Sequence, residues 1–367
     1  MASHRGYLLI ADLSGYTAYL TTTEMAHANP VIMSLLEVLV ARLGDPLHLW
    51  RMEGDAVLAY TTDKDFPSGD TFLSICEELY TAFAARRQNI QSNTSCPCRA
   101  CAQVGDLDLK MLVHYGEFQE MQIGPMRDIS GPDVILVHRL CKTGVKEATG
   151  IRSYAMMSGA AFEAMGKPQG LVEYSESFEH FGEVPLHVYD LAAAWHRLRD
   201  GRERVYIAEE DGILTTRIRL ALSPAKVWEI LVAPQSKTVW MGLKAVNLDA
   251  DLGRPGMGAA YHCIHAEAEF HFKVVDWEPF RYFSNQFVVF ADTSLRHDET
   301  YELTAVEGGT EIRYTTGPVY DPEDPERARH PEVDAVLVGF YGPGYDHWFP
   351  ELQRNVVEDP GAYVRGG

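Results

Sequence analysis

The chain has 367 residues, of which 52 are acidic and 32 basic, so its formal net charge is −20. A field of that sign repels nucleic-acid backbones and anionic membrane surfaces, and we therefore expect no nucleic acid as a partner. The apolar share of 46% suits a globular protein, and the length predicts two cores. Residues 1–10 form no secretion signal, and no segment reaches the roughly 18 to 20 uncharged apolar residues of a membrane span. We expect a cytoplasmic protein with no membrane span.

The first half of the chain alternates short apolar runs, typical of strands, with apolar residues spaced by three and four, typical of helices. The expected elements in chain order are a strand over residues 7–12, a helix over 30–43, a hairpin of strands over 47–50 and 56–60, a helix from Asp70, a loop over 91–105, a strand over 107–113 and a helix from Pro132. This order predicts an α+β sandwich with helices on one face of a sheet.

A charged, aperiodic stretch separates the two halves. We expect a first domain over residues 1–195, a linker over 196–212 and a second domain over 213–367. The expected elements of the second domain are a strand over 218–222, a helix over 223–232, strands over 270–277, 282–290, 294–304 and 310–316, and a helix within 331–358. One curved antiparallel sheet closed by a C-terminal helix is a helix-grip arrangement.

Two aspartates stand where strands of the first domain end. Asp12 closes the first strand, and Asp55 lies in the turn of the hairpin. On neighbouring strands, the two carboxylates can hold divalent ions that clamp a triphosphate and polarise a 3′-hydroxyl for in-line attack. Each aspartate taken alone also fits a turn or a helix cap.

Four segments of the first domain resemble the blocks that characterise class III nucleotidyl cyclases. Residues 11–17, Ala-Asp-Leu-Ser-Gly-Tyr-Thr, resemble the first metal-binding strand of that family, and residues 52–59 resemble its hairpin with the second metal-binding aspartate. Residues 113–117 and 131–140 resemble the next block, so the resemblance covers about residues 6–190.

The resemblance implies a ferredoxin-like, cyclase-type α/β sandwich. It also implies that Asp12 and Asp55 bind Mg²⁺ or Mn²⁺, that a nucleoside triphosphate is the partner, and that the protein is a homodimer with its sites between two subunits.

Two groups of positions depart from the cyclase pattern. Active cyclases carry an asparagine and, four residues later, an arginine on one face of a helix that meets the substrate, and these positions are Ile135 and Arg139 here. Arg139 is the expected catalytic residue, because it can neutralise phosphate charge, whereas Ile135 cannot orient the ribose. The lysine that reads adenine falls at Arg51, and its partner acid falls near Met126, with Asp128 two residues away. The resemblance thus implies nucleotide contacts from Arg51, Asp128 and Arg139.

Three cysteines, Cys96, Cys98 and Cys101, crowd into six residues of the expected loop. Three thiolates at this spacing can converge on one tetrahedral structural zinc ion. The candidates for a fourth ligand are Cys76, His114, Cys141 and a residue of a neighbouring subunit. Free thiols and a redox role are the alternatives.

The second domain resembles the START-like polyketide-cyclase superfamily through residues 228–231, 253–258 and 275–280. The glycines of 253–258 have the spacing of a dinucleotide loop, but they lie between strands, which favours a turn. The resemblance implies an apolar cavity that binds a hydrophobic small molecule. Six aromatic residues are candidates for its lining or for ordinary core, namely Trp240, Tyr261, Phe270, Phe272, Phe287 and Phe290.

These observations give one leading hypothesis and two alternatives. The leading hypothesis is metal-dependent nucleotide binding with weak or no cyclase activity, coupled to a hydrophobic-ligand sensor in signalling. The first alternative is an active adenylyl or guanylyl cyclase. The second is a non-enzymatic carrier of a lipid or polyketide-like ligand whose first domain only dimerises.

Overall fold

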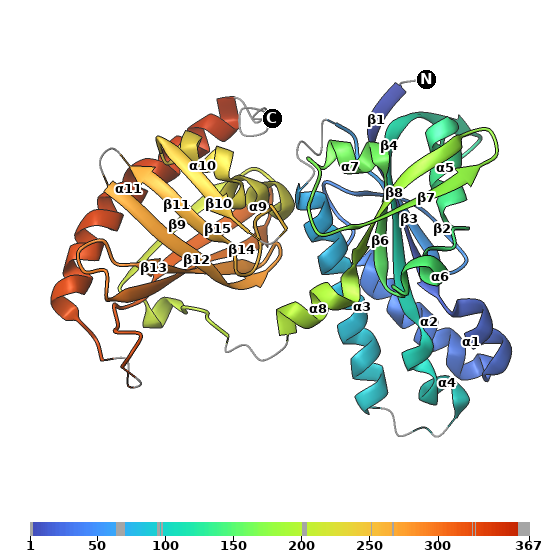
Figure 1. Cartoon of the computed structure of the whole chain (residues 1–367), viewed down its shortest axis with the longest axis horizontal. Helices are drawn as coiled ribbons and strands as arrows, with labels where there is room; N and C mark the ends of the chain where they lie inside the picture. Colours follow the sequence, from blue (N-terminus) through green and yellow to red (C-terminus); the bar gives the residue numbers. More distant parts are fainter. Residues whose placement is uncertain are drawn as a thin grey trace. The chain divides into compact units, whose positions relative to one another are not determined.

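The computed structural model describes residues 3–63, 70–93, 96, 98–199, 204–250, 252–265, 268–324, 326 and 328–358. The chain divides into two compact units, residues 1–200 and 201–367 (Figure 1). This division falls inside the range that the sequence predicts as a linker. Among the helices in the described ranges, none combines the length and the apolar character needed to cross a membrane.

A mixed sheet forms the centre of the first unit. Its strands are β1 (Ser3–Ser14), β2 (His48–Glu53), β3 (Ala56–Tyr60), β4 (Asp108–Ile123), β5 (Met126–Ser130), β6 (Tyr154–Ser158), β7 (Val172–Phe178) and β8 (Gly182–Asp190). Their order is β2-β3-β1-β4-β6-β8-β7, with β5 paired to β4. The β4–β6 pair is parallel, and the pairs of β1 with β3 and β4 are antiparallel. β1 and β4 are therefore central strands.

The helices of the first unit lie on both faces of this sheet. They are α1 (Tyr16–Thr22), α2 (Met25–Val40), α3 (Asp70–Asn93), α4 (Arg99–Ala102), α5 (Pro132–Leu140), α6 (Val145–Thr149), α7 (Gly159–Ala164) and α8 (Leu191–Arg199). Leu8 and Ile10 of β1 pack in one cluster with α5, whereas Tyr7 stacks on Phe72 of α3 with ring centroids 4.5 Å apart. Successive side chains of a strand point to opposite faces, so α5 and α3 cover opposite faces.

The prediction of helices on one face is therefore wrong. Residues 7–11 are all at most 3% exposed, and a continuous apolar run of this kind is the pattern of a strand covered on both faces. The expected loop over 91–105 is also incorrect in part, because α3 continues to Asn93, and α4 and a 3₁₀ turn at Val104–Asp106 follow.

Gly15 lets the chain turn from β1 into α1 directly after Asp12. Its φ is +88°, and a Cβ at this position would lie 2.9 Å from the carbonyl oxygen of Asp106. Glycine populates positive φ at little cost and leaves room for this contact. The turn places Asp12 near the end of a rigid central strand.

The second unit is one antiparallel sheet with helices packed against it. Its strands are β9 (Leu214–Leu220), β10 (Ala245–Asp249), β11 (Ala260–His265), β12 (Ala268–Glu278), β13 (Tyr282–Val288), β14 (Arg296–Val306) and β15 (Gly309–Thr316), and its α-helices are α9 (Pro224–Val232), α10 (Pro234–Trp240) and α11 (Pro331–Glu358). The strand order is β10-β11-β12-β13-β14-β15-β9. The long C-terminal helix α11 spans the range that the sequence predicts for it.

The segment expected as a linker is structured at both ends. Its start belongs to α8, which ends at Arg199. Near its other end, the backbone N–H of Val205 donates to Asp276 at 3.0 Å, and that of Ile207 donates to Thr300 Oγ1 at 2.9 Å. The sequence 196–212 therefore includes a helix end and a strap on the second sheet, and its residues 200–203 lie outside the described residues.

Candidate functional site

The structure brings together the two aspartates that the sequence predicts as metal ligands. Asp12 pairs with Ala56 in the β1–β3 register, so Asp55 at the start of β3 lies beside it, and the Leu13 N–H donates to the Asp55 carbonyl at 3.3 Å. Burial and the neighbouring Asp12 carboxylate raise the pKa of Asp55 to about 6. Two carboxylates in a partly buried place repel each other, and one of them holds its proton more tightly as a result.

Lys110 completes this group, and the sequence analysis missed it. Lys110 faces Asp12 in the β1–β4 register, and its Nζ lies 3.0 Å from Asp12 Oδ2. Burial acts to lower the pKa of Lys110, but the Asp12 carboxylate raises it overall. The available signal was a single charged residue inside the otherwise apolar run of 109–113.

The charges of this group leave one carboxyl without a counter-ion. Lys110 pairs with Asp12, while Asp55 has no ion-pair partner within the part of the chain that the structure describes. A divalent cation would relieve the repulsion between the carboxylates, and oxygen ligands are those that Mg²⁺ and Mn²⁺ prefer. The donor set therefore fits such an ion, which would share Asp12 with the ammonium group of Lys110.

Arg139 and Ile135 lie on one exposed face of α5. Ile135 is 53% exposed, and Arg139, one turn further on, is also exposed. Among the described residues, Arg139 forms no hydrogen bond or ion pair. The Arg139 guanidinium can therefore bind an anionic group of a ligand or of a second subunit. The neighbouring Ile135 side chain has no hydrogen-bonding group to add.

The two residues expected to contact the base form a pair. Arg51 Nη1 lies 3.0 Å from Asp128 Oδ2, and Trp50 Nε1 donates to Asp128 Oδ1 at 2.6 Å. The Arg51 guanidinium also stacks over the Trp50 ring at 4.5 Å. Asp128, two positions beyond the expected site, is therefore the acid that meets Arg51. Trp50 and Asp128 line an open cleft of about 780 Å³.

His114 belongs to a buried hydrogen-bond network and is not part of the cysteine cluster. It is 4% exposed, its Nδ1 lies 2.6 Å from Ser158 Oγ, and its Nε2 lies 3.1 Å from Asp133 Oδ1. Burial lowers the pKa of His114. Asp133 Oδ2 in turn accepts a hydrogen bond from the Glu117 N–H at 2.6 Å, so this network ties α5 to β4 and β6.

Comparison with known proteins gives the following similarities. A family described as "Protein of unknown function (DUF2652)" matches residues 32–149. "Uncharacterized protein Rv2561/Rv2562" of Mycobacterium tuberculosis is 28% identical over 153 residues, which cover 40% of this chain and 68% of that protein.

Solved structures of cyclases are similar to about half of this chain. The guanylyl cyclase Cya2 is 15% identical, with 51% of this chain and 92% of that chain covered and a TM-score of 0.38. The adenylyl cyclase CyaB from P. aeruginosa is 14% identical, with 52% of this chain and 97% of that chain covered and a TM-score of 0.36.

A third solved structure, protein MLL2253 from Mesorhizobium loti, carries no cyclase name. It is 18% identical, with 40% of this chain and 97% of that chain covered and a TM-score of 0.32.

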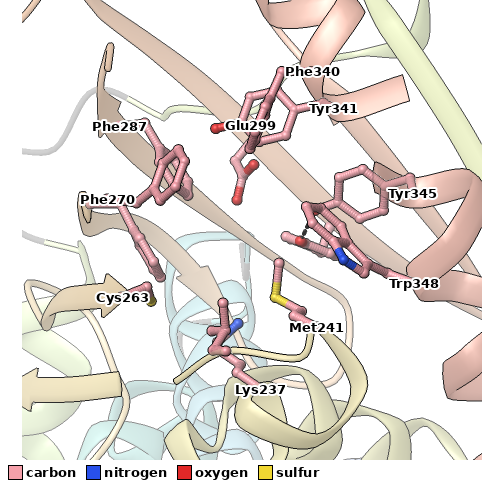
Figure 2. A pocket seen from close by; sticks show the side chains of 13 residues that line it. Lys237, Met241, Cys263, Phe270, Phe287, Glu299, Phe340, Tyr341, Tyr345 and Trp348 are labelled. Atoms are coloured by element: carbon pink, nitrogen blue, oxygen red, sulfur yellow. Dashed lines mark hydrogen bonds between the residues drawn. The ribbon is translucent and has the colours of Figure 1, made fainter. Parts of the chain in front are cut away.

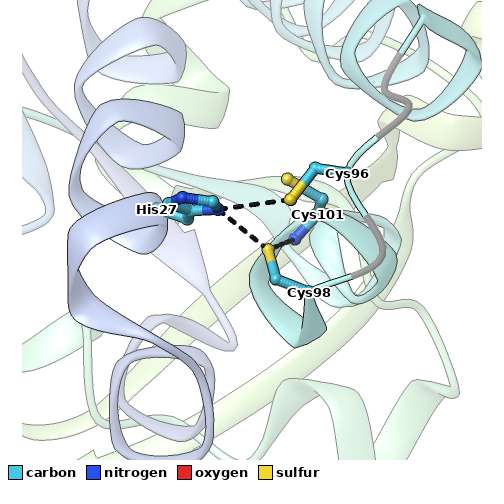
Figure 3. Close-up of side chains that lie close together, drawn as sticks. All are labelled: His27, Cys96, Cys98 and Cys101. Carbon is cyan, nitrogen blue, oxygen red and sulfur yellow. Dashed lines mark hydrogen bonds between the residues drawn. The ribbon is translucent and has the colours of Figure 1, made fainter.

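The three clustered thiols meet a histidine from a distant part of the chain. His27 Nδ1 lies 3.1 Å from Cys98 Sγ and 3.4 Å from Cys96 Sγ, and Cys101 completes the group (Figure 3). The fourth-ligand candidates within the chain are wrong. Cys76 is buried in α3, His114 bonds Ser158, and Cys141 is not in the group. His27 precedes Cys96 by 69 residues, so no local spacing pointed to it.

An aromatic cavity lies in the second unit (Figure 2). Three of the six aromatic residues that the sequence analysis named as candidates line this cavity, namely Phe270, Phe272 and Phe287. Trp240 is 1% exposed core, Tyr261 stacks on Phe272 with ring centroids 4.7 Å apart, and Phe290 is 39% exposed. The cavity has a volume of about 30 Å³, room for one or two water molecules, so a larger ligand requires the walls to move apart.

Two ionisable residues that the sequence analysis missed face this cavity. Figure 2 shows the Lys237 amine and the Glu299 carboxylate on opposite walls of the same space. They are 4% and 2% exposed. Burial lowers the pKa of Lys237 and raises that of Glu299 to about 7, although Asn285 and Tyr314 donate hydrogen bonds to Glu299 at 2.9 and 2.6 Å. The cavity is thus lined mainly by apolar side chains, with one ionisable group on each of two opposite walls.

Proposed function

We propose that the first unit binds a nucleoside triphosphate together with Mg²⁺ or Mn²⁺ and has weak or no cyclase activity. The observation that carries this proposal is the contact between Asp12 and Asp55 in a partly buried place, where burial and the Asp12 carboxylate together raise the pKa of Asp55 to about 6. The metal would screen the triphosphate from a chain of net charge −20 and polarise a 3′-hydroxyl.

The residues of this chain would divide the remaining tasks. Arg139 would neutralise phosphate charge, because its guanidinium has no partner among the described residues. Lys110 would hold Asp12 ionised in the absence of metal and add positive charge beside the phosphates. Ile135 gives the ribose no donor, and the loss of one such preorganised group costs roughly 10²- to 10³-fold in rate.

Arg51 and Asp128 would meet the base. Their ion pair, bonded to Trp50, offers both donors and acceptors, and Asp128 lines a cleft of about 780 Å³. A base that hydrogen-bonds to either residue has to compete with the pair itself. We therefore expect weak selection between adenine and guanine.

The oligomeric state and the compartment are parts of the same proposal. A homodimer would bring the Arg139 of one subunit to the aspartates of the other, as the cyclase resemblance implies. A cytoplasmic location, where cysteines stay reduced, belongs to this proposal as well.

Isothermal titration with a non-hydrolysable ATP analogue in the presence of Mn²⁺ tests nucleotide binding. We expect saturable binding by the full chain, and at least a tenfold weaker affinity in Asp12→Asn with Asp55→Asn. Arg197→Ala, a change in α8 away from these residues, is the control and should bind as the native chain does. Equal affinity in the double variant would contradict the proposal.

An active adenylyl or guanylyl cyclase remains the alternative, since both aspartates and Arg139 are present. Incubation of the protein with ATP or GTP and Mn²⁺, followed by detection of 3′,5′-cyclic product, separates the two functions. Turnover that Asp55→Asn abolishes would favour the enzyme. Ile135→Asn should raise any residual rate, because it restores a donor at the position that the cyclase pattern gives to asparagine.

For the second unit we propose binding of an apolar small molecule with a polar group, as its START-like resemblance implies. The support is an aromatic cavity whose walls include Lys237 and Glu299. Native mass spectrometry of freshly purified protein should show a bound small molecule that is lost from Lys237→Met. If the native protein carries this ligand while nucleotide binding is absent, a ligand carrier with a dimerisation domain is the better account.

A further inference from the structure

Four side chains with metal-binding atoms converge between α2 and the segment that follows α3 (Figure 3). They are His27, Cys96, Cys98 and Cys101, and their ligand atoms all lie within 4.8 Å of one another. Three of these residues come from six consecutive positions, whereas His27 comes from a different helix. Convergence from two separate elements is not explained by local sequence spacing.

The four ligand atoms lie close enough together to surround one tetrahedral zinc ion. Zinc binds thiolate sulfur at about 2.3 Å and imidazole nitrogen at about 2.0 to 2.1 Å, so ligand atoms at neighbouring corners lie about 3.5 to 3.8 Å apart. The observed distances from His27 Nδ1 are 3.1 Å to Cys98 Sγ and 3.4 Å to Cys96 Sγ. The remaining ligand atoms lie within 4.8 Å of one another, so shifts of at most about 1 Å bring all four to tetrahedral spacing around one ion.

Hydrogen bonds that do not involve a metal hold the two parts of the cluster together. The Tyr19 hydroxyl donates to the Ala100 carbonyl at 2.7 Å, and the Ala100 N–H donates to Glu24 Oε2 at 3.2 Å. The Cys101 N–H donates to Cys98 Sγ at 3.4 Å, and such N–H to sulfur bonds favour the thiolate form that binds metal. Ala100 is fully buried between Cys98 and Cys101. Its two hydrogen bonds therefore hold Cys98 and Cys101 beside α1 and α2.

We propose that His27, Cys96, Cys98 and Cys101 bind one structural Zn²⁺ ion that fastens the start of α2 to the segment after α3. With four protein ligands, the ion has no open position for a substrate, which is the coordination of structural rather than catalytic zinc. The ion cross-links parts of the chain about 70 residues apart, and its binding energy adds to the stability of the first unit. This role is separate from the aspartate site.

Metal analysis of the full-length protein tests the site. Protein purified without added metal should contain one Zn²⁺ per chain by inductively coupled plasma mass spectrometry. His27→Ala should lose most of it, and His180→Ala, which changes an exposed histidine elsewhere, should keep it. His27→Cys should restore full occupancy, because a fourth thiolate can take the same corner.

Replacement of zinc by Co²⁺ gives a second measurement that does not depend on the yield of folded variants. The native protein should show the intense visible bands of tetrahedral cobalt, and His27→Cys should shift them as the ligand set changes from one nitrogen and three sulfurs to four sulfurs. Metal content that is unchanged in His27→Ala would overturn the proposal. So would native protein that holds no metal and whose mass before reduction is two hydrogens lower, since a disulfide would then account for the thiols.

Discussion

Lys110 and Asp12 face each other on neighbouring central strands, with the Asp55 carboxyl close by. The two aspartates were predictable from sequence, because Asp12 ends an apolar run, Asp55 precedes one, and each lies in a recognisable block. Lys110 was not, because its meaning depends on the β1–β4 register, which places it opposite Asp12. The register of two strands almost a hundred residues apart is a tertiary property.

Asp55 should make divalent-ion binding depend on pH. Its pKa of about 6 means that protons compete with the metal below that pH. We expect the Mn²⁺ affinity to be constant above pH 7 and to fall roughly tenfold per pH unit well below pH 6. Titration calorimetry between pH 5 and 8 measures this, with a proton released on binding near pH 6. An affinity that is flat over this range would show that Asp55 is not a ligand.

Glu299 should make the stability of the second unit fall as the pH rises. Its folded pKa of about 7 lies above the ordinary value near 4.3, so the folded state binds the proton more tightly. The stabilisation is complete below about pH 4, is lost as the pH rises through 7, and amounts to about 4 kcal/mol. Urea denaturation at pH 5.5 and 8 should show about 2 kcal/mol of this loss, because part of it occurs below pH 5.5. Glu299→Gln should remove most of this dependence, and the exposed control Glu307→Gln should retain it.

At the scale of elements, the sequence predicted β1, β3, β4 and α5, which carry the candidate site, but it gave no expectation for α1, β5–β8, α6–α8, α10, β10 and β11. It also did not predict how the elements pack. The ranges expected for β3, α9 and α11 agree with the structure because turn residues and prolines mark their ends, whereas β2 continues to Glu53, three residues past its expected end. The short α4 was missed, since four residues give no helical period. The second helix-covered face of the sheet was missed because strand order and the direction of each crossover are set by tertiary packing.

The contact between β4 and α5 depends on a glycine. A Cβ at Gly116 would lie 2.3 to 2.6 Å from side-chain atoms of Asp133, which also receives the His114 and Glu117 hydrogen bonds. We expect Gly116→Ala to destabilise the first unit by about 1 to 3 kcal/mol, because the carboxylate has to move. Gly44→Ala, where a Cβ meets nothing within 4 Å, is the matched control in a thermal or urea melt. Equal unfolding free energies for the two variants would show that the Asp133 carboxylate can shift at no cost, which would contradict this prediction.

For the whole molecule, length and the charged stretch predicted two domains, and the chain does form two compact units. The resemblance to cyclases further predicts a homodimer. Light scattering during gel filtration of the full chain should give a mass twice the 41.1 kDa of one chain at micromolar concentration. A monomer that nevertheless binds nucleotide with the aid of Asp12 and Asp55 would show that one subunit holds the complete site, against this expectation.

Electron paramagnetic resonance of Mn²⁺ tests the central claim most directly, because it follows the metal itself. Bound Mn²⁺ loses the sharp six-line signal of the free ion. With ATP analogue present, the native chain should remove this signal in proportion to its concentration, beyond what the nucleotide alone removes. Asp12→Asn with Asp55→Asn should leave the signal at the level of the nucleotide alone. If the double variant removes as much signal as the native chain, the two aspartates do not hold the metal, and the proposed nucleotide site is wrong.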